Sequence, residues 1–141
     1  MLACYGQGLL AQGGRDWNLA RDRYLEAYAG FAALGTPVPQ GLALAGLARC
    51  DEAAGEATAA RERYDEVLKL SRRIGEPGLT STALEGLCRL AADSGDRALA
   101  STLLAEATQL RTTSSRPSPP HERRDLAATI VDLAPNVVPS V

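Results

Sequence analysis

Apolar residues recur at intervals of three and four along most of this chain, the spacing that places them on one face of an α-helix. The middle of the chain shows two such stripes in succession. The first consists of Leu42, Leu44, Leu47 and Ala48, and the second of Ala57, Ala60, Tyr64, Val67 and Leu68. Gly55 separates the stripes, and Gly75 with Pro77 follows the second, as is typical of helix ends. The pattern therefore predicts two consecutive helices between residues 38 and 77.

The same helix pair recurs with a period of 40 residues and without insertion. Columns of identical residues show the register: Ala20, Ala60 and Ala100; Gly6, Gly46 and Gly86; Glu26, Glu66 and Glu106; Pro37, Pro77 and Pro117. A fixed period of this length is typical of repeat arrays, in which one small unit is copied and stacked. We therefore expect an all-α domain of three antiparallel helix pairs, in units 1–37, 38–77 and 78–117.

A different pattern follows the third unit. Residues 121–133 carry Leu126, Ile130 and Leu133 at helical spacing, which predicts a single closing helix over the exposed face of the last pair. The stretch before it, 112–120, is rich in Ser, Thr and Pro. Residues 134–141 contain two prolines and no periodic pattern, so we expect a flexible tail after a repeat domain that covers 1–133.

Glycine recurs inside the first helix of each predicted pair, at Gly6, Gly46 and Gly86. Glycine at such a position costs roughly 1 kcal/mol relative to alanine. Its recurrence predicts that a neighbouring backbone approaches too closely for a side chain, although glycine could also be merely tolerated there. Further columns of small residues are expected to be buried where the two helices of a pair cross: Gly8, Ala48 and Cys88 in the first helices, and Ala20, Ala60 and Ala100 in the second.

Composition narrows the class of protein. The 141 residues carry a formal net charge of −2, which argues against an electrostatic surface for nucleic acid. No apolar run approaches the length of a membrane span, and no secretory signal is present. Cys4, Cys50 and Cys88 lack paired spacing, so we expect reduced cysteines and no metal site. These features predict a cytoplasmic protein that binds neither membrane nor nucleic acid directly.

Residues suited to catalysis are few. His121 is the only histidine, and Asp125 follows it by one helical turn, but no nucleophile is placed beside them by the pattern. A histidine at a helix start is usually exposed to solvent. Trp17, at the turn between the first two helices, is expected to be a packing aromatic. The sequence therefore predicts no catalytic residue, no cofactor and no metal.

The residues of the second unit resemble the tetratricopeptide repeat (TPR). They are Leu44, Leu47 and Ala48 of the first helix, Gly55-Glu56 at the turn, Ala60, Tyr64 and Val67 of the second helix, and Pro77 after it. The resemblance implies a right-handed superhelix. The common TPR has about 34 residues, and the longer unit here, with the segment 95–126, is similar to the C-terminal repeat regions of large bacterial LuxR-type and MalT-like ATP-binding transcriptional regulators. The chain has no GxxxxGK phosphate loop and no separate basic helical domain.

The TPR resemblance implies that the first helix of each pair lines a concave groove. The groove residues that it implies are Tyr5, Leu9, Gln12, Arg49, Glu52, Glu85 and Arg89. Arg49 and Arg89 lie one repeat apart, so their guanidinium groups are expected side by side, where they suit a carboxylate or a phosphate. Tyr5 and Leu9 would add an apolar shelf. The alternative is a solvated face on which Arg49 pairs with Glu52 or Glu85.

These features predict a non-catalytic protein-interaction and signal-sensing module, a scaffold of a bacterial transcriptional regulator or of its stand-alone relative. Its partner is expected to be a protein or peptide, with an anionic group at Arg49 and Arg89. The alternatives are a small protein that holds an anionic metabolite in the groove, and an enzyme on a helical-repeat scaffold. We also expect a homodimer through the N-terminal helix pair, or docking of that pair on further repeats. The candidate residues are Leu2, Leu9, Leu10 and Trp17.

Overall fold

The computed structural model describes residues 2–113 and 120–137, with side chains up to residue 130. These residues form seven α-helices and no strand, so the all-α prediction is confirmed. The helices are α1 (Leu2–Gly13), α2 (Trp17–Leu34), α3 (Pro37–Ala53), α4 (Ala57–Ile74), α5 (Pro77–Asp93), α6 (Arg97–Thr113) and α7 (Pro120–Val137).

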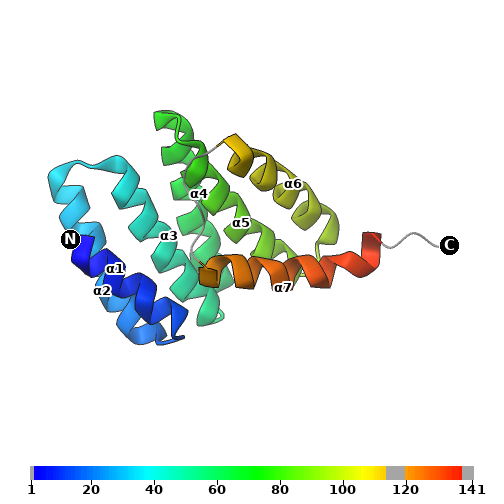
Figure 1. Ribbon diagram of the computed structural model, residues 1–141, viewed down its shortest axis with the longest axis horizontal. Coiled ribbons are helices and arrows are strands. Elements are labelled where there is room, and N and C mark those ends of the chain that lie inside the picture. Colours follow the sequence, from blue (N-terminus) through cyan, green and yellow to red (C-terminus); the bar gives the residue numbers. More distant parts are fainter. Residues whose placement is uncertain (1, 114–119, 138–141) are drawn as a thin grey trace.

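The first six helices pack in chain order, each against the helix before it and the helix after it (Figure 1). In addition, α1 contacts α3, and α3 contacts α5. These three helices therefore form one layer, called the inner row here, while α2, α4 and α6 lie behind it. Each helix pair thus presents its first helix on the same face of the array.

Left-handed residues end the helices where the 40-residue register places glycine. Gly35 and Gly75 cap α2 and α4 with φ of 68° and 70°. Gly55 and Gly95 turn the chain from α3 to α4 and from α5 to α6 with φ of 78° and 86°. Glycine adopts this conformation without the steric penalty that other residues meet. The equivalent residue of the first unit is Arg15, which adopts a φ of 64°.

Tyrosine rings explain two of the three glycines inside the inner row. A Cβ at Gly46 would lie 2.6 Å from the ring of Tyr24, and a Cβ at Gly86 would overlap the ring of Tyr64. The expectation of a close backbone is therefore wrong, because the neighbour is a fully buried side chain from the second helix of the preceding pair. Gly6 has nothing within 4 Å of its Cβ position, so close approach does not explain it.

The small columns are buried at the helix crossings, as predicted. Ala20, Ala60 and Ala100 have no exposed surface, and the same holds for Ala48 and Cys88 in the inner row. Tyr24 packs with Ala20 and Leu47, and Tyr64 packs with Ala48, Ala60 and Leu90. The core is therefore a series of clusters, most of which join one unit to the next, while the cluster of Cys88, Ala91 and Ala100 lies within the third unit.

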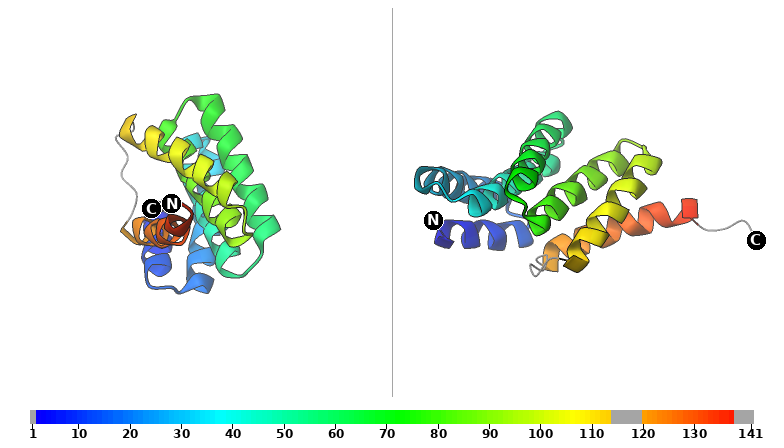
Figure 2. Two further views of the ribbon diagram at one scale, coloured as in Figure 1. Left: turned by 90° about the vertical axis from the view of Figure 1, so that its right-hand side faces the viewer. Right: turned by 90° about the horizontal axis from the view of Figure 1, so that it is seen from above.

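The position of α7 differs from the expectation of a helix that closes the last pair. It contacts α5 and α6, but its first two turns also reach the C-terminal ends of α1 and α3, so it crosses the inner row (Figure 1). Figure 2 shows α1 and α7 on the same side of the array, with the start of α7 beside the end of α1. In the 40-residue register Leu126 takes the place of Gly46 and Gly86, so a fourth unit would lack the space that receives the residue equivalent to Tyr24 and Tyr64.

The bounds of α7 also differ from the prediction. The helix begins at Pro120 and continues to Val137, so residues 134–137, which we expected in the tail, are helical. Residues 138–141 of the expected tail, and 114–119 of the Ser-, Thr- and Pro-rich stretch, lie outside the described residues. None of the helices in the described part of the chain combines the length and the apolar character needed to cross a membrane.

Candidate partner-binding site

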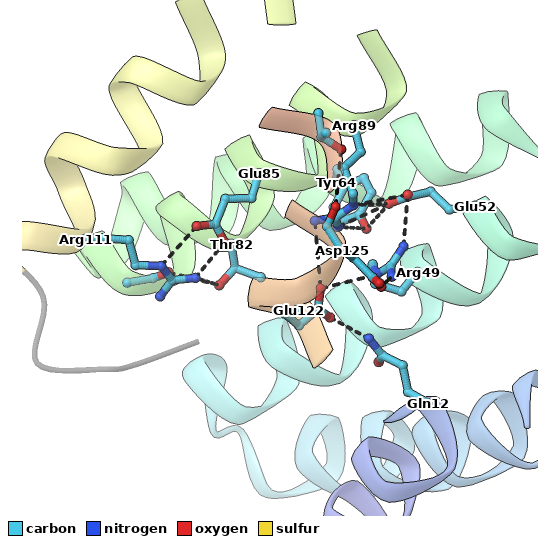
Figure 3. A network of polar contacts seen from close by, with 12 residues as sticks. Gln12, Arg49, Glu52, Tyr64, Thr82, Glu85, Arg89, Arg111, Glu122 and Asp125 are labelled. Atoms are coloured by element: carbon cyan, nitrogen blue, oxygen red, sulfur yellow. Dashed lines mark hydrogen bonds and ion pairs between the residues drawn. The ribbon is translucent and has the colours of Figure 1, made fainter. Parts of the chain in front are cut away.

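Charged side chains, buried in the inner row and half-buried in α7, gather where α7 crosses the inner row (Figure 3). Arg49 and Glu52 come from the last turns of α3, Arg89 from the equivalent turn of α5, and Glu122 and Asp125 from the first turns of α7. We call these five residues the groove cluster. Arg49 and Arg89 lie 40 residues apart in the sequence, so the repeat itself places them on the same face of neighbouring helices.

Glu52 joins the two arginines from within the inner row. One of its carboxylate oxygens lies 3.0 Å from Nη1 of Arg49 and 3.2 Å from Nε of Arg89. The hydroxyl of Tyr64 donates a hydrogen bond of 2.5 Å to the other oxygen and accepts one of 3.1 Å from Arg89. The side chains of Arg49, Glu52 and Arg89 are only 7–8% exposed. Their geometry is therefore set by the packing of α3, α4 and α5.

The carboxylates of α7 complete the cluster from the opposite side. Glu122 lies 3.2 Å from Nε of Arg49 and 3.8 Å from Nη1 of Arg89. It also accepts a hydrogen bond of 2.5 Å from the side-chain amide of Gln12 in α1. Asp125 pairs with Nη2 of Arg49. Residues three apart project from the same side of a helix, so both carboxylates meet the inner row together.

Arg15 holds the second carboxylate from the turn between α1 and α2. Its Nη2 lies 2.7 Å from Asp125. The guanidinium groups of Arg15 and Arg49 both lie over the ring of Trp17, at 5.9 and 5.5 Å from its centroid. Trp17 is therefore a platform for two cations as well as a packing aromatic. The sequence pattern did not predict this role of Trp17. Arg15, which stands where the later units have the left-handed Gly55 and Gly95, could have indicated it.

The charges of the site balance only when α7 is in place. Arg15, Arg49 and Arg89 supply three positive charges, and Glu52, Glu122 and Asp125 supply three negative ones. Without the two α7 carboxylates, Glu52 would remain against three arginines, an excess of two positive charges. An unpaired buried charge is costly. The two α7 carboxylates therefore neutralise the positive excess at this end of the inner row.

The pKa values of the α7 acids reflect this field. Burial disfavours the ionised form of Glu122, but Arg89, Arg49 and the hydrogen bond from Gln12 outweigh burial and hold its pKa below the ordinary value. For Asp125, burial is likewise outweighed by the hydrogen bond from Arg15 and by Arg49, and its pKa is also lowered. Both carboxylates are therefore ionised at neutral pH.

The predicted groove residues fall into three groups. Gln12, Arg49, Glu52 and Arg89 come together around α7, as their shared face suggested. The partner of Arg49 in the inner row is Glu52, one of the two acids considered, whereas Glu85 pairs with Arg111 of α6 at 2.8 Å. The other two residues, Tyr5 and Leu9, pack against the cluster of Tyr24 and Leu47 instead of forming a shelf beside the arginines.

The candidates for catalysis lie in environments that favour unreactive forms. His121 is half-buried beside Gly13, contrary to the expectation of exposure, and its Nε2 is buried without a hydrogen-bond partner. Burial lowers the pKa of His121, so the ring is neutral at pH 7. Burial also raises the pKa of Cys50 to about 11 and raises that of Cys88. Both thiols are therefore protonated and weakly nucleophilic at neutral pH.

A second buried charge lies on the side of α3 that faces α2 and α4. Asp51 is buried between Arg21 and Arg63, with each arginine nitrogen 3.0 Å from a carboxylate oxygen. The side chain of Arg63, in α4, is half-buried in this contact. These two ion pairs link α2, α3 and α4, and all three charged groups belong to the array itself. Among the described residues, no group of three or more His, Cys, Asp or Glu side chains could hold a metal ion.

No protein-family model, no curated protein and no solved structure matches the chain.

Proposed function

We propose that this chain is a non-catalytic protein-interaction and signal-sensing module, whose inner row binds a helical segment of a protein partner. The observation that carries the proposal is the seating of α7 on Arg49 and Arg89 through Glu122 and Asp125. The 40-residue register and its TPR-like residues support the further proposal that the module belongs to a bacterial transcriptional regulator or to a stand-alone relative.

A helix fits this surface better than a small free anion. The positive groups come from three elements, with Arg15 in the α1–α2 turn, Arg49 in α3 and Arg89 in α5. One helix that crosses the row reaches all of them through two side chains, and Gln12 adds a neutral hydrogen-bond donor to the first. Helix-in-groove recognition uses side chains spaced in this way. The arginine geometry is already fixed by Glu52 and Tyr64, so little ordering is needed on binding.

The test uses a full-length variant whose own α7 is repelled, Glu122→Arg/Asp125→Arg, and a labelled peptide with the natural sequence of residues 119–137. We expect saturable binding in fluorescence anisotropy, and loss of binding when Arg49→Met is added to the variant. Circular dichroism of both variants controls for folding of the array. A folded variant that fails to bind the peptide contradicts the proposal. Displacement of the peptide by millimolar phosphate or citrate would favour the anionic-metabolite alternative.

A further inference from the structure

We propose that α7 is a built-in competitor for the inner row, and that the partner is a helix with the pattern Glu-x-x-Asp that displaces it. This inference rests on the proposed function and specifies the chemistry of the partner. The two acids of the pattern correspond to Glu122 and Asp125, whose carboxylates contact α1, α3, α5 and the α1–α2 turn. Recognition therefore reads two negative charges one helical turn apart.

The order of the two acids follows from their reach. The longer side chain of Glu122 extends to Gln12, Arg49 and Arg89, which lie on three different helices. The shorter side chain of Asp125 meets Arg49 and Arg15 close to the backbone of α7. A pattern with glutamate first and aspartate three residues later therefore reproduces the ionic contacts that the described side chains of α7 make with the inner row.

Over residues 120–130, whose side chains are described, the attachment of α7 is mostly polar, in contrast to that of the other helices. Each of α2 to α6 buries apolar side chains between its neighbours. Among the described side chains of α7, Thr129 alone is buried, while Ile130 is 44% exposed. An element with few buried apolar contacts opens without unfolding the rest of the protein. Helix α7 can therefore leave the groove while the array stays folded.

The fit of α7 is also imperfect at its first turn. The Nε2 atom of His121 is buried without a hydrogen-bond partner, and the ring lies against Gly13. A buried polar atom without a partner weakens the complex that contains it. A second cost lies in the α1–α2 turn. Arg15, whose side chain pairs with Asp125, adopts a left-handed φ there that L-residues disfavour. A partner helix that keeps the two carboxylates and replaces the histidine by an apolar residue would avoid the first of these costs.

The experiment compares two full-length proteins, the wild type and Glu122→Gln/Asp125→Asn, in which the two α7 side chains keep their shape and lose their negative charges. The probe is a labelled, alanine-based helical peptide that contains one Glu-x-x-Asp pattern and no other residue of α7. The matched control peptide has Gln-x-x-Asn in the same frame. We expect the acidic peptide to bind the variant at least about tenfold more tightly than it binds the wild type, because a competing bound state lowers apparent affinity. The control peptide should bind neither protein.

Amide hydrogen exchange of the wild type supplies the second readout. Saturating acidic peptide should accelerate exchange in residues 121–130 and slow it in α3 and α5. Equal affinity for both proteins, or an unchanged α7, would refute the competition. Equal binding of the two peptides would refute recognition through carboxylates. If the peptide of residues 119–137 binds the repelled variant and the Glu-x-x-Asp peptide does not bind, this inference fails and the proposed function stands; if neither binds, both fail.

Discussion

Glu52 and Arg89 are separated by 37 residues in the chain, and Nε of Arg89 lies 3.2 Å from the Glu52 carboxylate. The contact joins α3 of one repeat to α5 of the next, and both side chains are 8% exposed. Tyr64, from the helix between them, bonds to both partners. Arg89, which also pairs with Glu122 of α7, is therefore held by the interface between the second and third repeats. The site and the fold share these contacts.

The glycines of the inner row should respond in opposite ways to alanine. Gly86→Ala places a Cβ on the ring of Tyr64, and we expect it to lower the free energy of unfolding by about 1–3 kcal/mol. Gly6→Ala meets nothing within 4 Å and should raise it by up to about 1 kcal/mol, because alanine favours the helix. Urea unfolding of both variants measures the difference, and the same sign for both would contradict the tyrosine contacts.

We expect Arg15 to stabilise the docked position of α7 through its ion pair and to destabilise the α1–α2 turn through its backbone conformation. Arg15→Gly relieves the left-handed φ of 64° and removes the contact of 2.7 Å to Asp125. The array should stay as stable or gain up to about 1 kcal/mol, while amides of α7 exchange faster. Gly55→Ala is the matched control, because its φ of 78° should make alanine cost about 1 kcal/mol with no effect on α7. Slower exchange in α7 of Arg15→Gly would show that this contact does not hold the helix.

Acid should release α7 in two stages, the first of which depends on His121. Its pKa is lowered by burial from an ordinary value of 6.5, so the released helix binds a proton more readily than the docked one. Docking therefore weakens as the pH falls below about 6.5, until the docked histidine is also protonated. Amide exchange of α7 between pH 7 and 5, corrected for intrinsic rates, measures this stage. His121→Gln should remove it, and an unchanged pH profile in that variant would assign the effect to another group.

The second stage belongs to the carboxylates. The pKa values of Glu122 and Asp125 lie below their ordinary values of 4.5 and 3.8. The stabilisation that these groups give is complete above the ordinary values and is lost as the pH falls through the lowered ones. We expect α7 to lose protection below about pH 4 in the wild type, whereas Glu122→Gln/Asp125→Asn shows no such stage. A second stage of the same size in that variant would mean that other acids control it.

Self-association through the N-terminal helix pair stays a proposal, which two exposed leucines support. Leu2 is 74% exposed and Leu10 is 79% exposed, whereas the other candidates, Leu9 and Trp17, pack against the first core cluster. We expect light scattering over a dilution series to show a dimer that dissociates on Leu10→Glu, because an apolar patch that meets its own copy tolerates no charge there. A wild type that stays monomeric at the highest concentration would rule the dimer out.

The helices of the three repeat units and their ends could be predicted because the same pattern of residues recurs from unit to unit. Gly35, Gly55, Gly75 and Gly95 stand where the backbone is left-handed, and the alanine column stands where helices cross. The identity of the group that fills the space at Gly46 and Gly86 could not be predicted, since a glycine column indicates space without indicating whether a backbone or a ring occupies it.

Only the part of the site that belongs to the inner row could be predicted from the sequence. The 40-residue register places Arg49 and Arg89 at equivalent positions of neighbouring helices, so the period of the repeat alone predicts that they lie side by side. The position of α7 depends on contacts between residues more than 70 apart, such as Arg49 with Asp125, and the repeat pattern ends before α7 begins. A hydrophobic stripe indicates that a helix packs somewhere. The complementary charges of Glu122 and Asp125 decide where, and pairing of that kind becomes visible only when the folded inner row is known.

The central claim, that the two arginines hold α7 through its paired carboxylates, is tested most directly by amide hydrogen exchange of residues 120–130 at neutral pH. The wild type is compared with Glu122→Gln/Asp125→Asn and with the control Arg123→Gln/Arg124→Gln, which changes exposed residues of the same helix. We predict protected α7 amides in the wild type and in the control, and rapid exchange in the first variant while α3 and α5 remain protected. Equal protection of α7 in all three proteins, or none in the wild type, would contradict the claim.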